Sequence, residues 1–221
     1  NEKKMEASLD VASKSMKPSS ISLIAPTITT RSARIVQQHS DSYYRLDLNA
    51  LIVTPKVRNM LRRASQKVSV EQSNEWKDEH KAIVDEFLVT HQVSEESRHI
   101  FIRIPEYVSA SKSVHILNAL DNEERLAAFD VVDYGSKDYA FYMFNFASQK
   151  HHVPGASDLL LSEMIASARE RGKRFVNLGL AINKGVTFFK QKWGGVPFLN
   201  HEFALSETPR ASIIEALLSI L

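Results

Sequence analysis

The chain has 221 residues, no cysteine and a formal net charge of +2. A chain of this length buries enough surface to fold without disulfides or metals, and the lack of cysteine excludes thiolate metal sites, iron–sulfur clusters and cysteine catalysis. The small charge gives no argument for nucleic-acid binding by itself, and no apolar run approaches the ~20 residues of a membrane span. A cysteine-free chain fits a reducing compartment, so we expect a cytoplasmic protein.

The first half of the chain begins with a polar stretch, residues 1–42, which we expect to be a partly mobile N-terminal extension. Thr54 followed by Pro55 is typical of a helix start, because the hydroxyl caps free amides and proline suits the first helical position. The segment RHIFIRI alternates and predicts a strand. The strands expected in this half are 43–51, the short 68–71 and 98–104. The expected helices are 54–67 and 74–88.

The second half predicts three strands joined by short polar turns, which is typical of an antiparallel meander. The third strand is apolar on both faces, so it is expected at the centre of a sheet. The expected elements are the strands 114–120, 125–134 and 139–147, a helix 158–171, a strand 175–182, a short helix 186–193, a strand 197–205 and a terminal amphipathic helix 211–221. This order predicts one mixed α/β domain over residues 43–221, with an antiparallel-rich sheet flanked by helices.

Six of the seven glycines lie between Gly155 and Gly195, and the loop SQKHHVPGAS joins the central strand to the next helix. The first amides of a helix lack internal partners, so this loop is a candidate phosphate cradle at a helix N-terminus. The alternative is an ordinary capped helix after a Pro-Gly turn. We expect Gly155 to lie on the surface, where a glutamate would cost little stability. His151 and His152 are adjacent, which does not suit one metal ion, and no metal site is predicted.

Five cations crowd into twelve residues of the first helix: Lys56, Arg58, Arg62, Arg63 and Lys67. Such a run is usually a solvated helix face. The functional alternative is a contact for phosphates, either of a cofactor or of RNA.

Three stretches of the sequence together resemble one superfamily. They are KVRNMLRRA at 56–64, VPGASDLL with NLGLAI at 153–160 and 177–182, and FKQKWGG at 189–195. The chain resembles the GNAT acyltransferases, and within them the FemABX-like proteins and the C-terminal domain of lysyl-phosphatidylglycerol synthases. The resemblance implies a GNAT-like fold and transfer of an acyl group from acyl-CoA, as co-substrate, to a small-molecule or peptide amine.

The resemblance also implies roles for particular residues. Backbone amides of the loop would hold the CoA pyrophosphate, and the central strand would pair with the pantetheine arm. The cofactor-binding residues expected on this basis are Phe144, Phe146, His152, Gly155, Ala156, Ser157 and Asn183. Lys190 stands where many GNAT enzymes carry a tyrosine that protonates the leaving thiolate.

Polar residues within apolar strands give further candidates. Asn145 and Asn177 must pair with each other, the backbone or a ligand, because an unpaired buried amide is costly. The expected catalytic residues are Lys190, Asn177, Asn145 and Tyr142, and Asp130 is a further candidate, whereas Asp133 is expected to be a turn carboxylate.

Two other functions remain open from the sequence. The basic helix favours a FemABX-like aminoacyltransferase that binds tRNA through Lys56, Arg58, Arg62, Arg63 and Lys67. The lysine at position 190 favours a non-catalytic module of the same fold that binds a small ligand or a protein. The terminal helix 211–221 suits packing on its own sheet or, in a homodimer, on a second subunit.

Overall fold

The computed structural model describes residues 2–28 and 34–207, so the expected terminal helix 211–221 lies outside the described residues. The chain divides into two compact units. Unit 1 comprises Asn1–Tyr43, Leu180–Ile182 and Pro197–Leu221, and unit 2 comprises Tyr44–Gly179 and Asn183–Val196. That residues 43–221 form a single domain stays a prediction.

Unit 1 contains regular structure in the region expected to be an extension. It has the helix α1 (Glu2–Met16), the strand β1 (Ser20–Ala25) and most of the strands β2 (Arg34–Asp47) and β8 (Val196–Glu207). β1 pairs antiparallel with β8, from Ser20 opposite Glu207 to Ala25 opposite Glu202. The Glu202 carboxylate also accepts the backbone amide of Ile28 at 2.6 Å, which ties the end of β1 to β8.

Unit 2 is built on a mixed sheet in which neighbouring strands follow the order β7-β6-β5-β4-β3. These strands are β3 (Val68–Ser73), β4 (Val114–Asp121), β5 (Leu126–Asp133), β6 (Tyr139–Ala147) and β7 (Phe175–Leu180). β3 to β6 pair antiparallel, whereas β6 and β7 are parallel. The predicted meander, the central position of the 139–147 strand and the mixed α/β class are confirmed.

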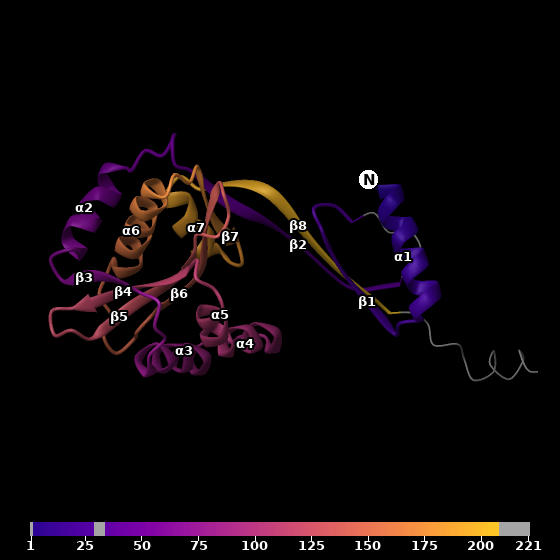
Figure 1. The fold of residues 1–221 in the computed structure, drawn as a ribbon, viewed down its shortest axis with the longest axis horizontal. Helices are drawn as coiled ribbons and strands as arrows, with labels where there is room; N and C mark the ends of the chain where they lie inside the picture. Colours follow the sequence, from indigo (N-terminus) through magenta and orange to yellow (C-terminus); the bar gives the residue numbers. More distant parts are fainter. Residues whose placement is uncertain (1, 29–33, 208–221) are drawn as a thin grey trace, which may run out of the picture. The chain divides into compact units, whose positions relative to one another are not determined.

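Helices cover both faces of this sheet (Figure 1). α2 (Pro55–Ala64) and α6 (Ala156–Glu170) lie on one face, and α3 (Asp78–Thr90), α4 (Glu95–Ile102) and α5 (Ile104–Ala110) on the other. α7 (Lys184–Lys192) follows β7. The predicted start of α2 is confirmed, because the Thr54 hydroxyl accepts the Val57 amide at 3.3 Å.

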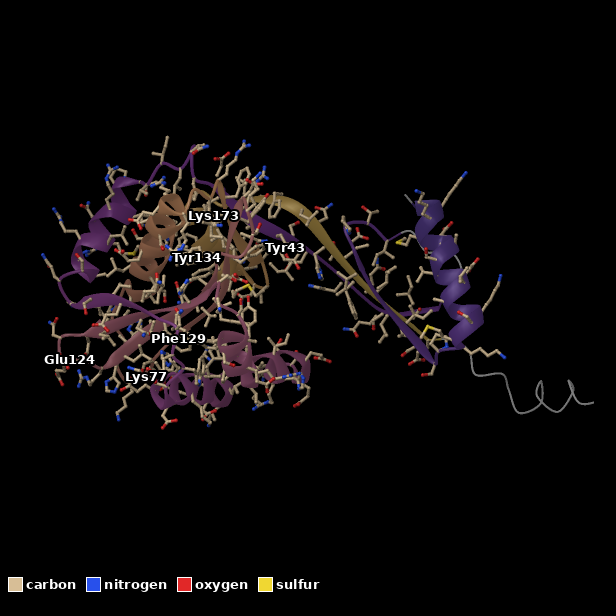
Figure 2. The ribbon with its side chains drawn as sticks, viewed as in Figure 1. Tyr43, Lys77, Glu124, Phe129, Tyr134 and Lys173 are labelled. Atoms are coloured by element: carbon tan, nitrogen blue, oxygen red, sulfur yellow. The ribbon has the colours of Figure 1, made fainter. Side chains whose placement is uncertain are left out.

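The interior of unit 2 on the α3 side is packed around Phe129, which has no exposed surface (Figure 2). His80 lies against the Phe129 ring, with ring centroids 4.9 Å apart. His80 is only 1 % exposed, and its Nε2 lies 2.8 Å from the Asn118 side-chain oxygen. His80 is thus a packed core residue of unit 2.

The strand predicted over residues 98–104 is wrong, because this segment is helical. α4 begins after Ser94, whose hydroxyl accepts the Ser97 amide, and α5 begins at Ile104 with Pro105 in its first turn. No residue of α4 is buried. The alternation of RHIFIRI therefore does not reflect one buried and one exposed strand face.

Candidate functional site

The parallel strands β6 and β7 separate part-way along their length. Their pairing runs from Tyr139 opposite Phe175 to Phe141 opposite Asn177, and in the described chain no further pair joins them. β6 continues to Ala147 with its other edge still paired to β5. The edge of β6 that faces away from β5 is thus open beyond Phe141. Ligands of α/β sheets characteristically bind at such carboxyl ends of parallel strands.

A β-bulge lies at the opening. Val132 of β5 faces Tyr142 and Val131 faces Phe144, so Met143 is the extra residue on β6. Bulges re-aim side chains and backbone groups, and they occur often beside functional sites. Met143 and Phe144 also line a largely apolar cavity of about 520 Å³, whose other wall is formed by α4 and α5. We refer to it as the apolar cavity.

Polar groups are present at the rim of the apolar cavity. His99, Arg103 and Tyr107 line it.

The Tyr107 hydroxyl donates to Asp133 at 2.7 Å. Burial alone would raise the pKa of Asp133, but the Ser113 hydroxyl, the Tyr107 hydroxyl and the Gly135 amide all donate to the carboxylate and lower it. Asp133 is therefore a structural turn carboxylate, as expected.

The loop after β6 leads directly into α6. Gly155 immediately precedes the helix with φ +87°. The Ala156 amide donates to the Val153 carbonyl at 3.1 Å, and the first helical bond runs from the Leu159 amide to the Gly155 carbonyl. The amides of Ser157 and Asp158 precede this ladder, so they are the donors that the N-terminus presents.

Gly155 is not an open surface position, contrary to the sequence-based expectation. A Cβ at this residue would lie 3.2 Å from the Ala64 Cβ and 3.3 Å from the Met60 Cγ, both on α2. The glycine therefore serves the close packing of α6 on α2 as well as the left-handed turn. A glutamate here would disturb folding and is a poor probe of ligand binding.

Asp158 in the first turn of α6 has its charge satisfied within the protein. Its carboxylate accepts the Trp193 indole N–H at 2.8 Å and forms an ion pair with Lys192 at 2.6 Å. These contacts tie the start of α6 to the end of α7. The neighbouring ammonium compensates the negative charge that would otherwise oppose an anion at this helix N-terminus.

Three of the polar candidates lie together on the sheet face that α6 covers. The Asn145 amide donates to Asp130 at 2.6 Å. The second Asp130 oxygen and the Tyr142 hydroxyl are both buried, and they lie close enough for each group to influence the pKa of the other. Burial is the main cause that raises the pKa of Asp130 well above its ordinary value, and burial likewise raises the pKa of Tyr142. Burial thus favours the neutral carboxyl of Asp130 over its carboxylate.

The other two catalytic candidates each lie near Gly179 of β7. The Asn177 side-chain oxygen accepts the backbone amide of Gly179 at 2.8 Å. The Asn177 side chain is therefore paired with the backbone of its own strand. Lys190 is only 3 % exposed, and its Nζ lies 3.8 Å from the place of a Cβ on Gly179. The neighbouring Phe189 stacks on the Tyr142 ring, with centroids 6.3 Å apart. α7 thus connects the two groups of candidates.

No family model and no curated protein matches the chain. Several solved structures are similar to it. The L-PGS structure from Bacillus licheniformis aligns with a TM-score of 0.54 at 15 % identity, over 83 % of this chain and 65 % of that one. A tandem GNAT protein from the clavulanic acid biosynthesis pathway aligns with a TM-score of 0.56 at 14 % identity, over 94 % and 70 % of the two chains. FemX aligns with a TM-score of 0.56 at 10 % identity, over 91 % and 77 %.

The chain has the GNAT fold. This confirms the superfamily resemblance of the sequence at the level of fold, including its likeness to FemX and L-PGS. The chain spans less than two thirds of the L-PGS chain that it matches.

Within the GNAT fold, the residues expected to bind acyl-CoA fall in two places. Phe144 lies just beyond the bulge, whereas the Phe146 side chain is 3 % exposed and packs in the core, so only its backbone is available. His152 is exposed, and Ser157 lies in the first turn of α6. Asn183 caps α7 by accepting the Val186 amide at 3.0 Å. The backbone amide of Ala156 already donates to the Val153 carbonyl.

The five cations predicted for one basic helix are exposed, four of them on α2 and Lys67 in the turn that follows it. Val57 and Ala64 are buried, while the side chains of Lys56, Arg58, Arg62, Arg63 and Lys67 face solvent. In the described ranges, no helix is long and apolar enough to cross a membrane.

Sequence reasoning missed several features of this site. The bulge at Met143 leaves no pattern in an apolar strand. The apolar cavity was missed because residues 98–104, which include most of α4, were interpreted as a strand. A signal for α4 was present, since Ser94 followed by Glu95 and Glu96 is a typical helix N-terminus.

Proposed function

We propose that this chain is an N-acyltransferase that moves an acyl group from acyl-CoA to an amine. The observation that carries the proposal is the open edge of β6 beyond Phe141, with the bulge at Met143. An extended pantetheine arm would pair with this edge, and its thioester would reach the bulge. The acyl group or the amine would then occupy the apolar cavity beside Met143 and Phe144.

The loop between β6 and α6 suits the other end of the donor. The amides of Ser157 and Asp158 and the positive end of the helix dipole favour a pyrophosphate. The ion pair of Asp158 with Lys192 supports this role, because it compensates the carboxylate's charge near the bound anion. His152 is exposed on the same loop.

The reaction forms a C–N bond and breaks the C–S bond of the thioester. The amine nitrogen attacks the carbonyl carbon, loses a proton, and the CoA sulfur leaves as a thiolate that takes up a proton. We assign the protonation to Lys190, whose ammonium lies at the end of β7 beside Gly179. Asp130, Asn145 and Tyr142 act as positioning residues that hold β6 at the bulge.

The test is release of free thiol from acetyl-CoA with a panel of primary amines. The chain has no cysteine, so every thiol detected belongs to CoA. Amine-dependent release is expected, and Lys190→Met should lower kcat while leaving KM for acetyl-CoA unchanged. Lys184→Met, at an exposed position of the same helix, is the matched control. Absence of amine-dependent release despite CoA binding would contradict the transfer and favour the non-catalytic module.

The exposed cations of α2 favour a second candidate donor, an aminoacyl-tRNA. Such a donor would contact Arg58, Arg62 and their neighbours through phosphates, so binding should weaken steeply as salt rises. The logarithm of the binding constant for tRNA, plotted against the logarithm of salt concentration, tests this. A replacement of Arg58 and Arg62 by Gln should flatten the slope, and no measurable binding at low salt would remove this candidate.

A further inference from the structure

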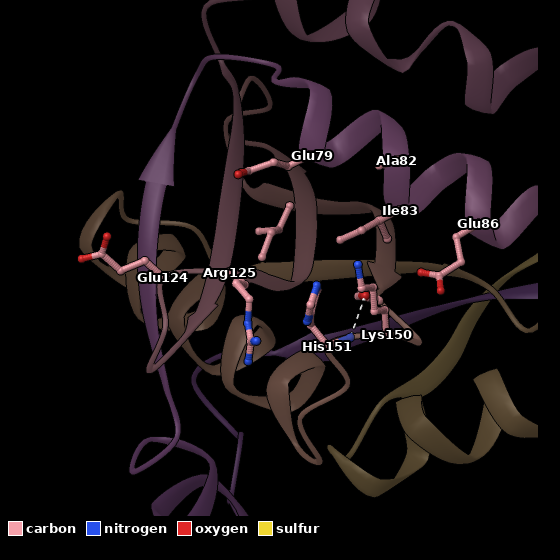
Figure 3. A pocket seen from close by; sticks show the side chains of 10 residues that line it. Glu79, Ala82, Ile83, Glu86, Glu124, Arg125, Lys150 and His151 are labelled. Carbon is pink, nitrogen blue, oxygen red and sulfur yellow. Dashed lines mark hydrogen bonds between the residues drawn. The ribbon is translucent and has the colours of Figure 1, made fainter.

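Unit 2 has a second cavity, of about 430 Å³, beside α3. Its walls are α3, the turn between β4 and β5, and the first residues of the loop after β6 (Figure 3). Ala82, Ile83 and Leu126 provide apolar surface within it. Small-molecule sites measure about 300–1,000 Å³, so this volume suits a compact ligand. We call it the α3 cavity.

Charges of opposite sign line opposite sides of the α3 cavity. Glu79 and Glu86 are seven residues apart on α3, so they lie on the same helix face two turns apart. Lys150 and His151 lie across from them on the loop after β6 (Figure 3). The Glu124 side chain points away from the cavity in the same view.

These opposite charges do not neutralise one another directly. Among the residues that the structure describes, no ion pair joins α3 to Lys150. One carboxylate oxygen of Glu86 accepts the backbone amide of Gln149 at 3.1 Å. The second oxygen of Glu86 can accept from another donor. Arg125, the remaining cation of the lining, is already compensated by Asp121 at 2.8 Å and Glu123 at 2.6 Å.

A buried hydroxyl lies on the same side of the α3 cavity as Lys150 and His151. Ser148 is only 4 % exposed, and its oxygen accepts the His151 amide at 3.0 Å. Within the described chain this hydroxyl donates to no other group, so its proton is available to an acceptor in the cavity. An anionic group placed here would meet the Ser148 hydroxyl and the Lys150 ammonium together.

We propose that the α3 cavity binds a small zwitterion of dipeptide size, with its ammonium at Glu79 and Glu86 and its carboxylate at Lys150 and Ser148. Facing charges that stand apart across a cavity are complementary to a ligand that carries both signs. None of the residues assigned above to acyl transfer lines this cavity. The site therefore goes beyond the proposed function and is testable without acyl-CoA.

The test is calorimetric titration of the full chain, without CoA, using three probes. Ala-Ala carries both charges, N-acetyl-Ala-Ala lacks the ammonium, and Ala-Ala amide lacks the carboxylate. Ala-Ala is expected to bind, and each capped probe to bind at least about tenfold more weakly. No heat with millimolar Ala-Ala, or equal affinity for all three probes, would overturn the proposal.

Variants locate the binding. Glu86→Gln and Lys150→Gln should each weaken Ala-Ala binding by about tenfold or more. Glu95→Gln and Lys112→Gln change the same charges at exposed positions outside the cavity lining and should leave the affinity unchanged. Full binding in both cavity variants would contradict the site, whatever the outcome of the acyl-transfer assay.

Discussion

The Trp193 indole donates to the Asp158 carboxylate at 2.8 Å, and this bond joins the end of α7 to the first turn of α6. Trp193 is 2 % exposed and Asp158 is 7 % exposed, so the bond is shielded from water. Lys192 completes the arrangement at 2.6 Å. The position of the helix N-terminus that we propose to face the pyrophosphate is therefore fixed by a contact between distant parts of the sequence.

Trp193→Phe should destabilise unit 2. Phenylalanine keeps an aromatic ring but removes the N–H, so Asp158 loses its buried hydrogen bond while it keeps Lys192. The expected loss in free energy of unfolding is about 1–3 kcal/mol, measured by urea denaturation. A change below about 0.5 kcal/mol would show that the bond contributes little.

Gly155→Ala should cost more stability than Gly172→Ala. Both glycines have positive φ, +87° and +68°, so both variants strain the backbone. Only the Cβ at position 155 would press on Ala64 and Met60, whereas nothing lies within 4 Å of a Cβ at position 172. Paired urea denaturation isolates the packing of α6 on α2, and equal losses in the two variants would contradict it.

Asp130 should make stability depend on pH. Burial raises its folded-state pKa well above the ordinary 3.8, so the folded chain keeps a proton that the unfolded chain has lost. The stability from this group is fully present below about pH 3.8 and is lost as the pH rises through the folded pKa. Asp130→Asn removes this titration.

Urea denaturation of both proteins from about pH 4 to 8 tests this expectation for Asp130. The stability of the natural chain relative to Asp130→Asn should fall with rising pH, by at most about 1.4 kcal/mol per pH unit. Parallel pH curves for the two proteins would mean that the carboxyl ionises normally in the fold.

The fold should favour the neutral form of His80. Burial lowers its pKa below the ordinary 6.5, although hydrogen bonds to Asn118 and Lys77 oppose this shift. Its Nδ1 accepts the Lys77 amide at 2.9 Å, so Nε2 carries the proton that is donated to Asn118. Nitrogen-15 NMR at pH 7 should report the neutral Nε2–H tautomer. A titration at or above pH 6.5 would contradict this arrangement.

The order of most elements could be predicted from the sequence because their signals are local. Thr54 and Pro55 start α2, and the apolar segment 139–147 forms the central strand. The segment 98–104 misled the prediction, because period-two alternation in a short exposed helix mimics a strand.

The site itself depends on contacts between distant segments, which no local pattern contains. Lys190 meets Gly179, Asn145 meets Asp130, and Gly155 meets α2 only once the sheet and helices have assembled. The sequence correctly indicated that Asn145 and Asn177 must be paired. Their partners, Asp130 and the Gly179 amide, emerge only from the structure.

The most direct test of the account is calorimetric titration of the chain with CoA, comparing His152→Glu with Gln92→Glu. Both residues are exposed, so each variant adds one surface carboxylate, but only position 152 lies on the loop before α6. We expect micromolar binding of CoA that is strongly weakened in His152→Glu and retained in Gln92→Glu. Absence of binding at millimolar CoA, or equal binding by both variants, would contradict the proposal that this loop holds the CoA pyrophosphate.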